Sequence, residues 1–248
     1  MSQETGGHGN AVLNRPSGDG TSAGQGPPSK ADMTRIQLRP IATPMALGFL
    51  ALAAASLVLS GLQLNWFPVQ QSTYVALCLV AFAFPLQLLA SIFGFLGRDA
   101  VAGTGMGLLA CSWLLTGAMK YLAPPGATIP VLGVFLLFVG LALFVPTTGA
   151  ALGKLVAAAV LFLAGLRFAL TGLYQLTGVT WWQYVAGIEG LVVVAVAFYA
   201  ALALQLEDLQ RETVLPTLRR KRGKASMQGN IEEQIQRVDR EAGVREQL

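Results

Sequence analysis

Long runs without charge constrain this chain more than any other feature. Only 12% of its 248 residues are charged, whereas a soluble domain carries about 25%. Most of the charges lie in the two ends of the chain. Between Pro44 and Leu206 the charged residues are Arg98, Asp99, Lys120, Lys154, Arg167 and Glu189. This distribution predicts an integral membrane protein with polar tails.

Six apolar segments are each long enough to cross a hydrocarbon core, which takes about 20 helical residues. They lie at 44–63, 73–96, 101–122, 130–148, 153–176 and 182–206. Backbone polar groups in lipid must be satisfied within each segment, so helices are expected. The links are short, which makes neighbouring helices antiparallel. The expected fold class is therefore an all-α integral membrane protein, with a six-helix transmembrane bundle over 41–210.

Two polar tails flank the predicted bundle. Residues 1–40 are rich in Gly, Ser, Pro and Gln, a composition typical of disorder. Residues 211–248 are basic and then mixed, which is typical of a solvated tail beside anionic lipid. The helical spacing of Ile231, Ile235 and Val238 leaves a short amphipathic helix open as an alternative.

The distribution of Lys and Arg predicts the orientation. The loops Leu64–Ser72, Ala123–Ile129 and Thr177–Trp181 contain neither residue, while both tails and the opposite loops are rich in them. We therefore expect a multi-pass protein of the plasma (inner) membrane with both termini in the cytoplasm. Lys120 lies near an outer helix end, from which it can reach the lipid headgroups. Pro85 is expected to interrupt the second helix.

No catalytic constellation is present. The single histidine, His8, lies in the N-terminal tail, and no hydrolase, phosphate-loop or metalloprotease motif occurs. The net charge of +4 is explained by the topology signal and does not indicate nucleic-acid binding. Cys78 and Cys111 lie in apolar runs and read as small packing residues. We expect no catalytic residues, no metal and no cofactor.

Arg167 stands in the middle of an apolar segment, where a charge costs at least about 2.5–3.5 kcal/mol. Glu189 lies on the next predicted helix, at a similar distance from the connecting loop. An ion pair between the two is therefore expected to be feasible. Two interpretations stay open: a structural clamp between the fifth and sixth helices, or an anion-attracting Arg beside a titratable Glu in a carrier.

Other polar side chains within the segments are candidates for the same path, or for interhelical hydrogen bonds. They are Gln87, Thr104, Ser112, Thr116, Thr171 and Gln175.

Several short motifs, in order, resemble the acetate uptake transporter family of bacterial succinate–acetate permeases and yeast acetate carriers. Ala42–Phe49 (ATPMALGF) is similar to the family's opening NPAPLGL, and Glu212–Pro216 (ETVLP) to its closing TVLP. Gln87, Thr104 and Trp113 fit a family stretch of Gln, Thr and Trp without a gap. The resemblance covers about residues 40–216.

The resemblance implies a path through each protomer and a set of residues that line it. Leu50 and Leu109 align with the family's constriction aromatics, so it implies an apolar constriction there. Gln87, Thr104 and Trp113 are implied to line the same path. Arg167 and Glu189 fall where the family is typically apolar.

The function expected from the sequence is a membrane transporter or channel for a small solute, most plausibly a monocarboxylate such as acetate. Proton coupling and a ring-shaped homo-oligomer are implied by the family resemblance. The expected partners are membrane lipids, a small-molecule substrate and further copies of the chain. The alternative is a non-transporting membrane scaffold or accessory subunit, in which Arg167 and Glu189 hold the bundle together.

Overall fold

The computed structural model describes residues 42–210 and 212–220, and its helices span nearly all of the first range. In chain order they are α2 (Met45–Gln63), η1 (Val69–Gln71), α3 (Ser72–Cys78), η2 (Leu79–Ala83), α4 (Phe84–Leu96), α5 (Ala100–Leu122), α6 (Pro130–Ala142), α7 (Phe144–Ala151), α8 (Leu155–Thr177) and α9 (Thr180–Gln210). No strand occurs within these residues. The predicted N-terminal tail 1–40 lies outside the described residues, as do residue 211 and residues 221–248 of the predicted C-terminal tail 211–248, with the amphipathic alternative around Ile235.

The described helices form six spans that are long and apolar enough to cross a membrane. The second span joins α3, η2 and α4, and the fourth joins α6 and α7. The predicted fold class, a six-helix transmembrane bundle, is confirmed. The protein is a multi-pass membrane protein.

Proline explains why two spans are interrupted. Pro85 has no N–H, so the helix before it widens into the π-helical turn η2 and restarts at Phe84, as the sequence predicted. Pro146 acts in the same way on the fourth span. It cannot donate to the carbonyl of Ala142, the residue at which α6 ends. The second break was not predicted.

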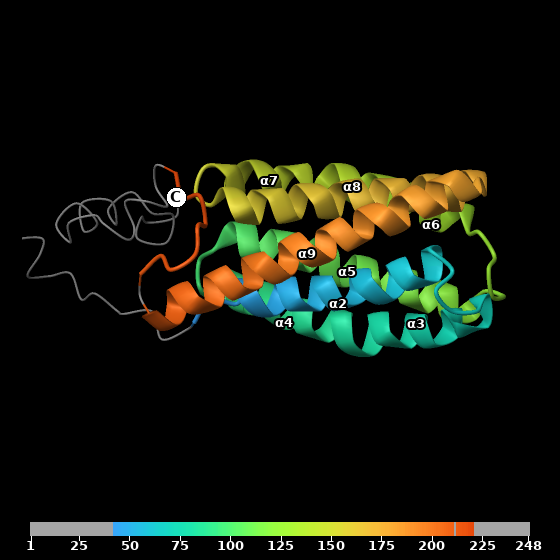
Figure 1. The fold of residues 1–248 in the computed structure, drawn as a ribbon, viewed down its shortest axis with the longest axis horizontal. Helices are drawn as coiled ribbons and strands as arrows, with labels where there is room; N and C mark the ends of the chain where they lie inside the picture. The colour runs from blue at the N-terminus through green and yellow to red at the C-terminus, as the bar shows by residue number, and fades with distance from the viewer. Residues whose placement is uncertain (1–41, 211, 221–248) are drawn as a thin grey trace, which may run out of the picture. The chain divides into compact units, whose positions relative to one another are not determined.

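Helices far apart in the sequence lie side by side. The first and last spans, α2 and α9, pack along each other, and further close pairs are α6 with α8 and α4 with α5 (Figure 1). We call the end where α2 begins and α9 finishes the tail end, and the opposite end, with residues 64–71, 123–129 and 178–179, the loop end.

Glycine allows α6 and α8 to approach closely. A Cβ on Gly133 would lie 2.8 Å from the carbonyl oxygen of Gly172, and the reverse distance is also 2.8 Å. Gly140 and Gly165 form a second such pair one or two turns along, at 2.8 and 3.0 Å. Contacts of this kind are typical of membrane helices, whose association depends on close packing.

The apolar core fills the tail-end half of the bundle. Its fully buried large side chains include Phe49, Leu52, Met106, Leu109 and Leu161. Gln87 and Ser91 are buried in the same half, where each donates to a backbone carbonyl. The interior of this half is therefore mostly packed hydrocarbon with few polar groups.

Residues 212–220, which we call the strap, fold back onto the tail end. The backbone N–H of Arg220 donates to the carbonyl of Gly153 at 2.9 Å, and the hydroxyl of Tyr199 donates to the carbonyl of Pro216 at 3.0 Å. Thr217 is buried against the bundle. The strap thus packs on the bundle through a few contacts while most of its residues are exposed, which the prediction of a solvated tail from residue 211 onwards did not specify.

Charges fasten the strap. The Arg219 guanidinium donates two bonds to the Glu207 carboxylate near the end of α9, one of them from Nε at 3.0 Å. The Nζ of Lys154 lies 3.5 Å from Glu207 Oε1, and the Thr217 hydroxyl donates to Oε2 at 3.3 Å. Burial lowers the pKa of Lys154, which lies between two spans, and Arg219 lowers it further, while Glu207 and Asp99 act in the opposite direction.

Candidate functional site

A row of polar side chains runs along one face of α8. Arg167, Thr171 and Gln175 are four residues apart, so they lie one above another on successive turns. All three are almost completely buried; the exposed fraction of Arg167 is 1%. The row extends from mid-span towards the loop end.

A second row faces it from α2. Ser56, Ser60 and Gln63 follow the same helical spacing and are buried. The Gln63 side chain bonds the hydroxyl of Thr171 at 3.2 Å, which joins the two rows. We call the six residues of these rows the polar track.

Arg167 occupies the deep end of the track and spans three helices. Its Nη1 donates to the carbonyl of Ala186 on α9 at 3.0 Å, and its Nη2 donates to the carbonyl of Ser56 on α2 at 3.1 Å. The guanidinium lies directly against Gly190, and a Cβ there would overlap it. A buried arginine fits here because α9 presents a glycine at this level.

The predicted ion pair is not formed by direct contact. Both carboxylate oxygens of Glu189 are buried and have no hydrogen-bond partner among the described residues. The two charges interact electrostatically, but the donors of Arg167 that are bonded go to backbone carbonyls. Depth along the helices could be estimated from the sequence, whereas rotation about each helix axis could not, and similar depth alone does not bring two side chains into contact.

Many buried polar atoms between the middle of the bundle and the loop end have no hydrogen-bond partner among the described residues. On the track they are Ser56 Oγ, Ser60 Oγ, Gln63 Oε1, Arg167 Nε and Gln175 Nε2. A buried polar group without a hydrogen bond costs about 1–3 kcal/mol. Such a concentration along one line is unusual for a purely structural core.

The α5 helix adds residues beside the track. Trp113 is fully buried and packs on Phe168, with the ring centroids 5.0 Å apart. Thr116 Oγ1 is buried without a partner, and Lys120 lies one turn further towards the loop end. The polar side chains of α5 thus follow the same direction as the track.

The track leads to a cavity of about 200 Å³ at the loop end, which we call the loop-end pocket. Polar side chains from α2, α3, α5, α8 and α9 line it, among them Gln63, Ser72, Lys120, Gln175 and Gln183. Gln63 and Gln175 belong to both the pocket and the track. The pocket and Arg167 are therefore the two ends of one row of polar groups.

The structure separates the residues predicted for the path into two groups. Gln87 is buried, with its Nε2 donating to the carbonyl of Gly48 at 3.1 Å, and Leu109 and Trp113 are also fully buried. Leu50 is 44% exposed and Thr104 is exposed on α5, so neither side chain lies inside the bundle.

The predicted constriction of Leu50 and Leu109 is therefore not formed inside the bundle, because only Leu109 lies there. Of the two neighbouring residues Phe49 and Leu50, Phe49 is the one whose side chain is buried. Adjacent residues on a helix differ by about 100° in direction, so an alignment shifted by one residue moves a side chain from the inside to the surface.

Sequence reasoning missed Ser56, Ser60 and Gln63. They are four and three residues apart, so they share one face of α2, as Arg167, Thr171 and Gln175 share one face of α8, and this shared face was the signal available. Short hydroxyl residues are common in membrane helices, where they bond to their own backbone, so the pattern was not distinctive by itself.

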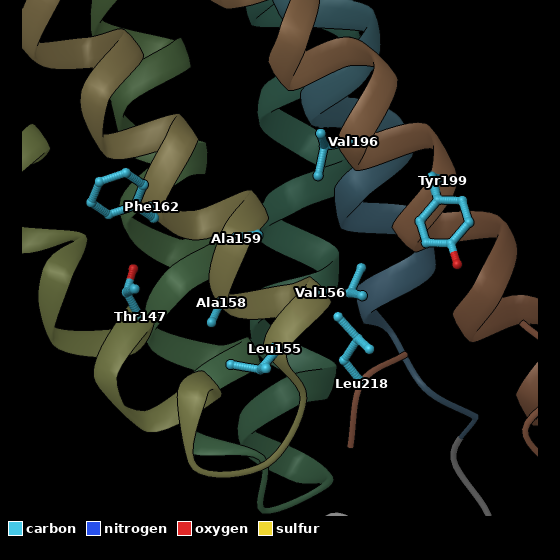
Figure 2. Close-up of a pocket in the computed structure, with 9 residues that line it drawn as sticks. All are labelled: Thr147, Leu155, Val156, Ala158, Ala159, Phe162, Val196, Tyr199 and Leu218. Carbon is cyan, nitrogen blue, oxygen red and sulfur yellow. The ribbon is translucent and has the colours of Figure 1, made fainter. Parts of the chain in front are cut away.

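A second cavity is chemically different. It is an open, almost wholly apolar groove of about 530 Å³ near the tail end, lined by Leu155, Val156, Phe162, Val196 and neighbours (Figure 2). Its hydroxyls are already bonded, since Thr147 donates to Leu143 and Tyr199 to Pro216. The groove offers nothing that would bind a charged solute. In the described part of the chain, no group of His, Cys, Asp or Glu is arranged to hold a metal.

The fold has a solved counterpart. The chain is similar to the structure of the bacterial acetate channel SatP, with a TM-score of 0.63 and 22% sequence identity over 71% of this chain and 99% of that one. The predicted resemblance to the acetate uptake transporter family is thus confirmed for the fold. No family model and no curated protein sequence matches the chain.

Proposed function

We propose that the chain forms a path across the membrane for a small anion, with a monocarboxylate such as acetate as the substrate class. The observation that carries this proposal is Arg167, fully buried at the deep end of a polar track that begins at the loop-end pocket. The similarity of the fold to an acetate channel supports it. In this proposal the protein is a transport protein and not an enzyme.

The chemistry of the track suits a carboxylate. A guanidinium presents planar donors that match two carboxylate oxygens, and Arg167 still has a buried, unpartnered Nε. Ser and Gln side chains along the track supply further donors. An anion moving along it exchanges one set of donors for the next, so its charge stays compensated in a region of low dielectric constant.

Glu189 is the residue that we propose for coupling to protons. Its buried carboxylate oxygens lack partners and interact with the Arg167 charge from the neighbouring α9. A group so placed changes the local charge when it gains or loses a proton. We therefore propose that Glu189→Gln removes any dependence of flux on a proton gradient, while anion flux driven by its own gradient persists.

Orientation and assembly are further parts of the proposal. The tail end faces the cytoplasm because the loops of the other end contain no Lys or Arg. The protein acts as a homo-oligomer with one path through each protomer. The membrane is the plasma (inner) membrane, and annular lipids are its other partners.

The orientation has a direct test. In a variant without Cys78 and Cys111, single cysteines at the exposed positions Gln70 and Thr148 are treated with an impermeant thiol reagent on intact cells. We expect labelling at 70 and not at 148. The reverse pattern would contradict the orientation.

The scaffold alternative rests on a specific observation. Arg167 bonds carbonyls of both α2 and α9, as a clamp between helices would. In that case its loss weakens the bundle and no solute flux exists to be lost. Flux and stability therefore have to be measured on the same variants.

The decisive experiment compares Arg167→Met with wild type in proteoliposomes, using labelled acetate. Each carbonyl that Arg167 bonds also accepts the N–H four residues later in its own helix, so Met should fold. We expect acetate flux to fall at least tenfold. Thr104→Val, on the exposed face of α5, is the matched control and should keep wild-type flux.

The alternative predicts a different pair of results. Absence of acetate flux in wild type, together with a lower thermal midpoint for Arg167→Met, would replace transport by the scaffold function. Wild-type flux in Arg167→Met would show that solute passes elsewhere.

A further inference from the structure

The loop-end pocket contains a positive charge without a local counter-charge. Lys120 is partly buried near the end of α5 and lines the pocket, and none of the described residues that line it is acidic. An ammonium group held in a confined site near lipid is costly unless an anion or water compensates it. The described lining of the pocket therefore provides the Lys120 ammonium group and no carboxylate to pair with it.

Gln175 is oriented so that it points a donor into this site. Its Oε1 accepts the backbone N–H of Ile129 at 2.9 Å, which fixes the side-chain amide. The Nε2 group is thereby left as the free end, and it is buried without an acceptor among the described residues. Gln175 is 1% exposed, so bulk water does not reach it freely.

Ser72 adds a second donor from the first turn of α3. Its hydroxyl is buried and has no partner among the described residues. By contrast, the amides of Asn65 and Gln183 are already engaged, with Tyr184 Oη and the carbonyl of Gln63 respectively, each at 2.9 Å. The unengaged groups around the pocket thus include one cation, the Gln175 amide donor, the Ser72 hydroxyl, which can donate or accept, and one acceptor, Gln63 Oε1.

The volume restricts the ligand. About 200 Å³ corresponds to roughly six or seven water molecules, at about 30 Å³ each. That space holds a small oxyanion with part of its hydration and excludes larger metabolites. A ligand with anionic oxygen acceptors suits the pocket because it combines an ammonium group with an unpartnered amide donor and a hydroxyl that can donate.

We propose that the loop-end pocket is a binding site for a small carboxylate, which pairs with Lys120 Nζ and accepts hydrogen bonds from Gln175 Nε2 and Ser72 Oγ. The site is distinct from Arg167 and binds whether or not the track conducts. If the proposed transport is correct, the site collects the anion at the mouth of the track. It replaces the expectation that Lys120 merely reaches for headgroups.

The test uses a probe inside the pocket. Ala127 lines the cavity, so Ala127→Cys in a background without Cys78 and Cys111, labelled with a trifluoromethyl reagent, gives a local ¹⁹F signal. The full chain in nanodiscs of zwitterionic lipid is titrated with acetate. We expect a saturable shift of the signal, and at least a tenfold increase in apparent Kd for Lys120→Met.

Matched variants keep the result specific. Lys120→Arg should restore most of the affinity, because it keeps the charge. Lys154→Met removes an identical charge at the tail end and should leave the titration unchanged, as should Arg167→Met. Ser72→Ala, which removes one neutral donor, should weaken binding about threefold and serves if Lys120→Met does not fold.

Other outcomes would overturn the proposal. An identical titration for wild type, Lys120→Met and Ser72→Ala would mean that no anion site exists here. A signal that responds to anionic lipid in the nanodisc and is not displaced by acetate would show that a lipid headgroup fills the pocket. Loss of flux in Arg167→Met with intact ¹⁹F titration would support both proposals, while intact titration without flux in wild type would refute only transport.

Discussion

The two ends of the bundle treat buried polar groups in opposite ways. At the tail end, Glu207 is bonded by Arg219 and Thr217 and approached by Lys154, so its charge is fully engaged. In the loop-end half, Ser56, Ser60 and others are buried with atoms that bond nothing in the described chain. The cluster around Glu207 is thus hydrogen-bonded within the protein, whereas the loop-end half concentrates buried polar atoms without a partner; Gln87 Oε1 is an exception in the tail-end half.

The two kinds of polar group have different consequences for the structure. Satisfied ionic clusters hold segments in one place, as the strap is held on α9. Unsatisfied donors in low dielectric weaken a fold unless water or a solute completes them. In this structure the loop-end pocket is the accessible part of the loop-end half, whereas the track residues behind it and the core of the tail-end half are both buried.

The largest effect on this comparison should come from Glu207→Gln. The side chains of Glu207 and Arg219 are 7% and 11% exposed, so the substitution replaces an ionic bond to a nearly buried guanidinium by a neutral one. We expect a loss of about 3 kcal/mol in strap attachment. Hydrogen exchange of residues 212–220 should rise, whereas the exposed control Asp208→Asn should leave it unchanged. Unchanged hydrogen exchange of residues 212–220 in Glu207→Gln would show that this ionic cluster does not hold the strap on the tail end.

Gly190→Ala should have the next largest effect, and in the other half. The added methyl group overlaps the Arg167 guanidinium and approaches Ser60 Oγ. Overpacking of this kind costs about 1–3 kcal/mol. Thermal unfolding measures it, with Gly153→Ala as control because its nearest neighbour would lie 3.8 Å away. Equal midpoints for the two variants would show that Arg167 can relocate freely.

Glu189→Gln should change stability by less than about 1 kcal/mol, because the carboxylate makes no hydrogen bond that is lost. A direct ion pair would instead have cost about 3–5 kcal/mol on loss of one partner. The free energy of unfolding of this variant therefore decides between contact and mere proximity. A loss above about 3 kcal/mol would restore the ion pair expected from the sequence.

Lys154→Met should have the smallest effect, at most a few tenths of a kcal/mol. The pKa of Lys154 is lowered by burial and by Arg219, so its protonated form is disfavoured in the fold. That penalty is fully present below the folded-state pKa and is lost as the pH rises from there to the higher unfolded-state pKa. Met should thus be slightly stabilising at neutral pH, with the difference from wild type shrinking at alkaline pH. A clear destabilisation at neutral pH would assign Lys154 a supporting role in the cluster.

Hydropathy predicted the spans well because it depends on composition along the chain alone. The break at Pro85 followed from the missing N–H, and the same reasoning would have placed one near Pro146. The direction of each side chain could not be obtained in this way. Leu50 and Thr104 were assigned to the interior by alignment, and a helix rotation of one residue places them outside.

The candidate site was predictable only in part. Arg167 was conspicuous because a charge in an apolar span needs compensation, and Thr171 and Gln175 followed from its helical face. Its partners were not predictable, since backbone carbonyls of Ser56 and Ala186 carry no signal in the sequence. The role of the strap was missed because its basic composition resembles that of a solvated tail.

The paired glycines of α6 and α8 have a mechanical consequence. With Gly133 against Gly172 and Gly140 against Gly165, each backbone fills the space that the other leaves, so neither helix can tilt or slide without collision. We therefore expect the two helices to move together as one unit. Any larger rearrangement of the bundle would then bend another span, and the π-helical turn Leu79–Ala83, between α3 and α4 in Figure 1, departs from regular helix and is the place where we expect it.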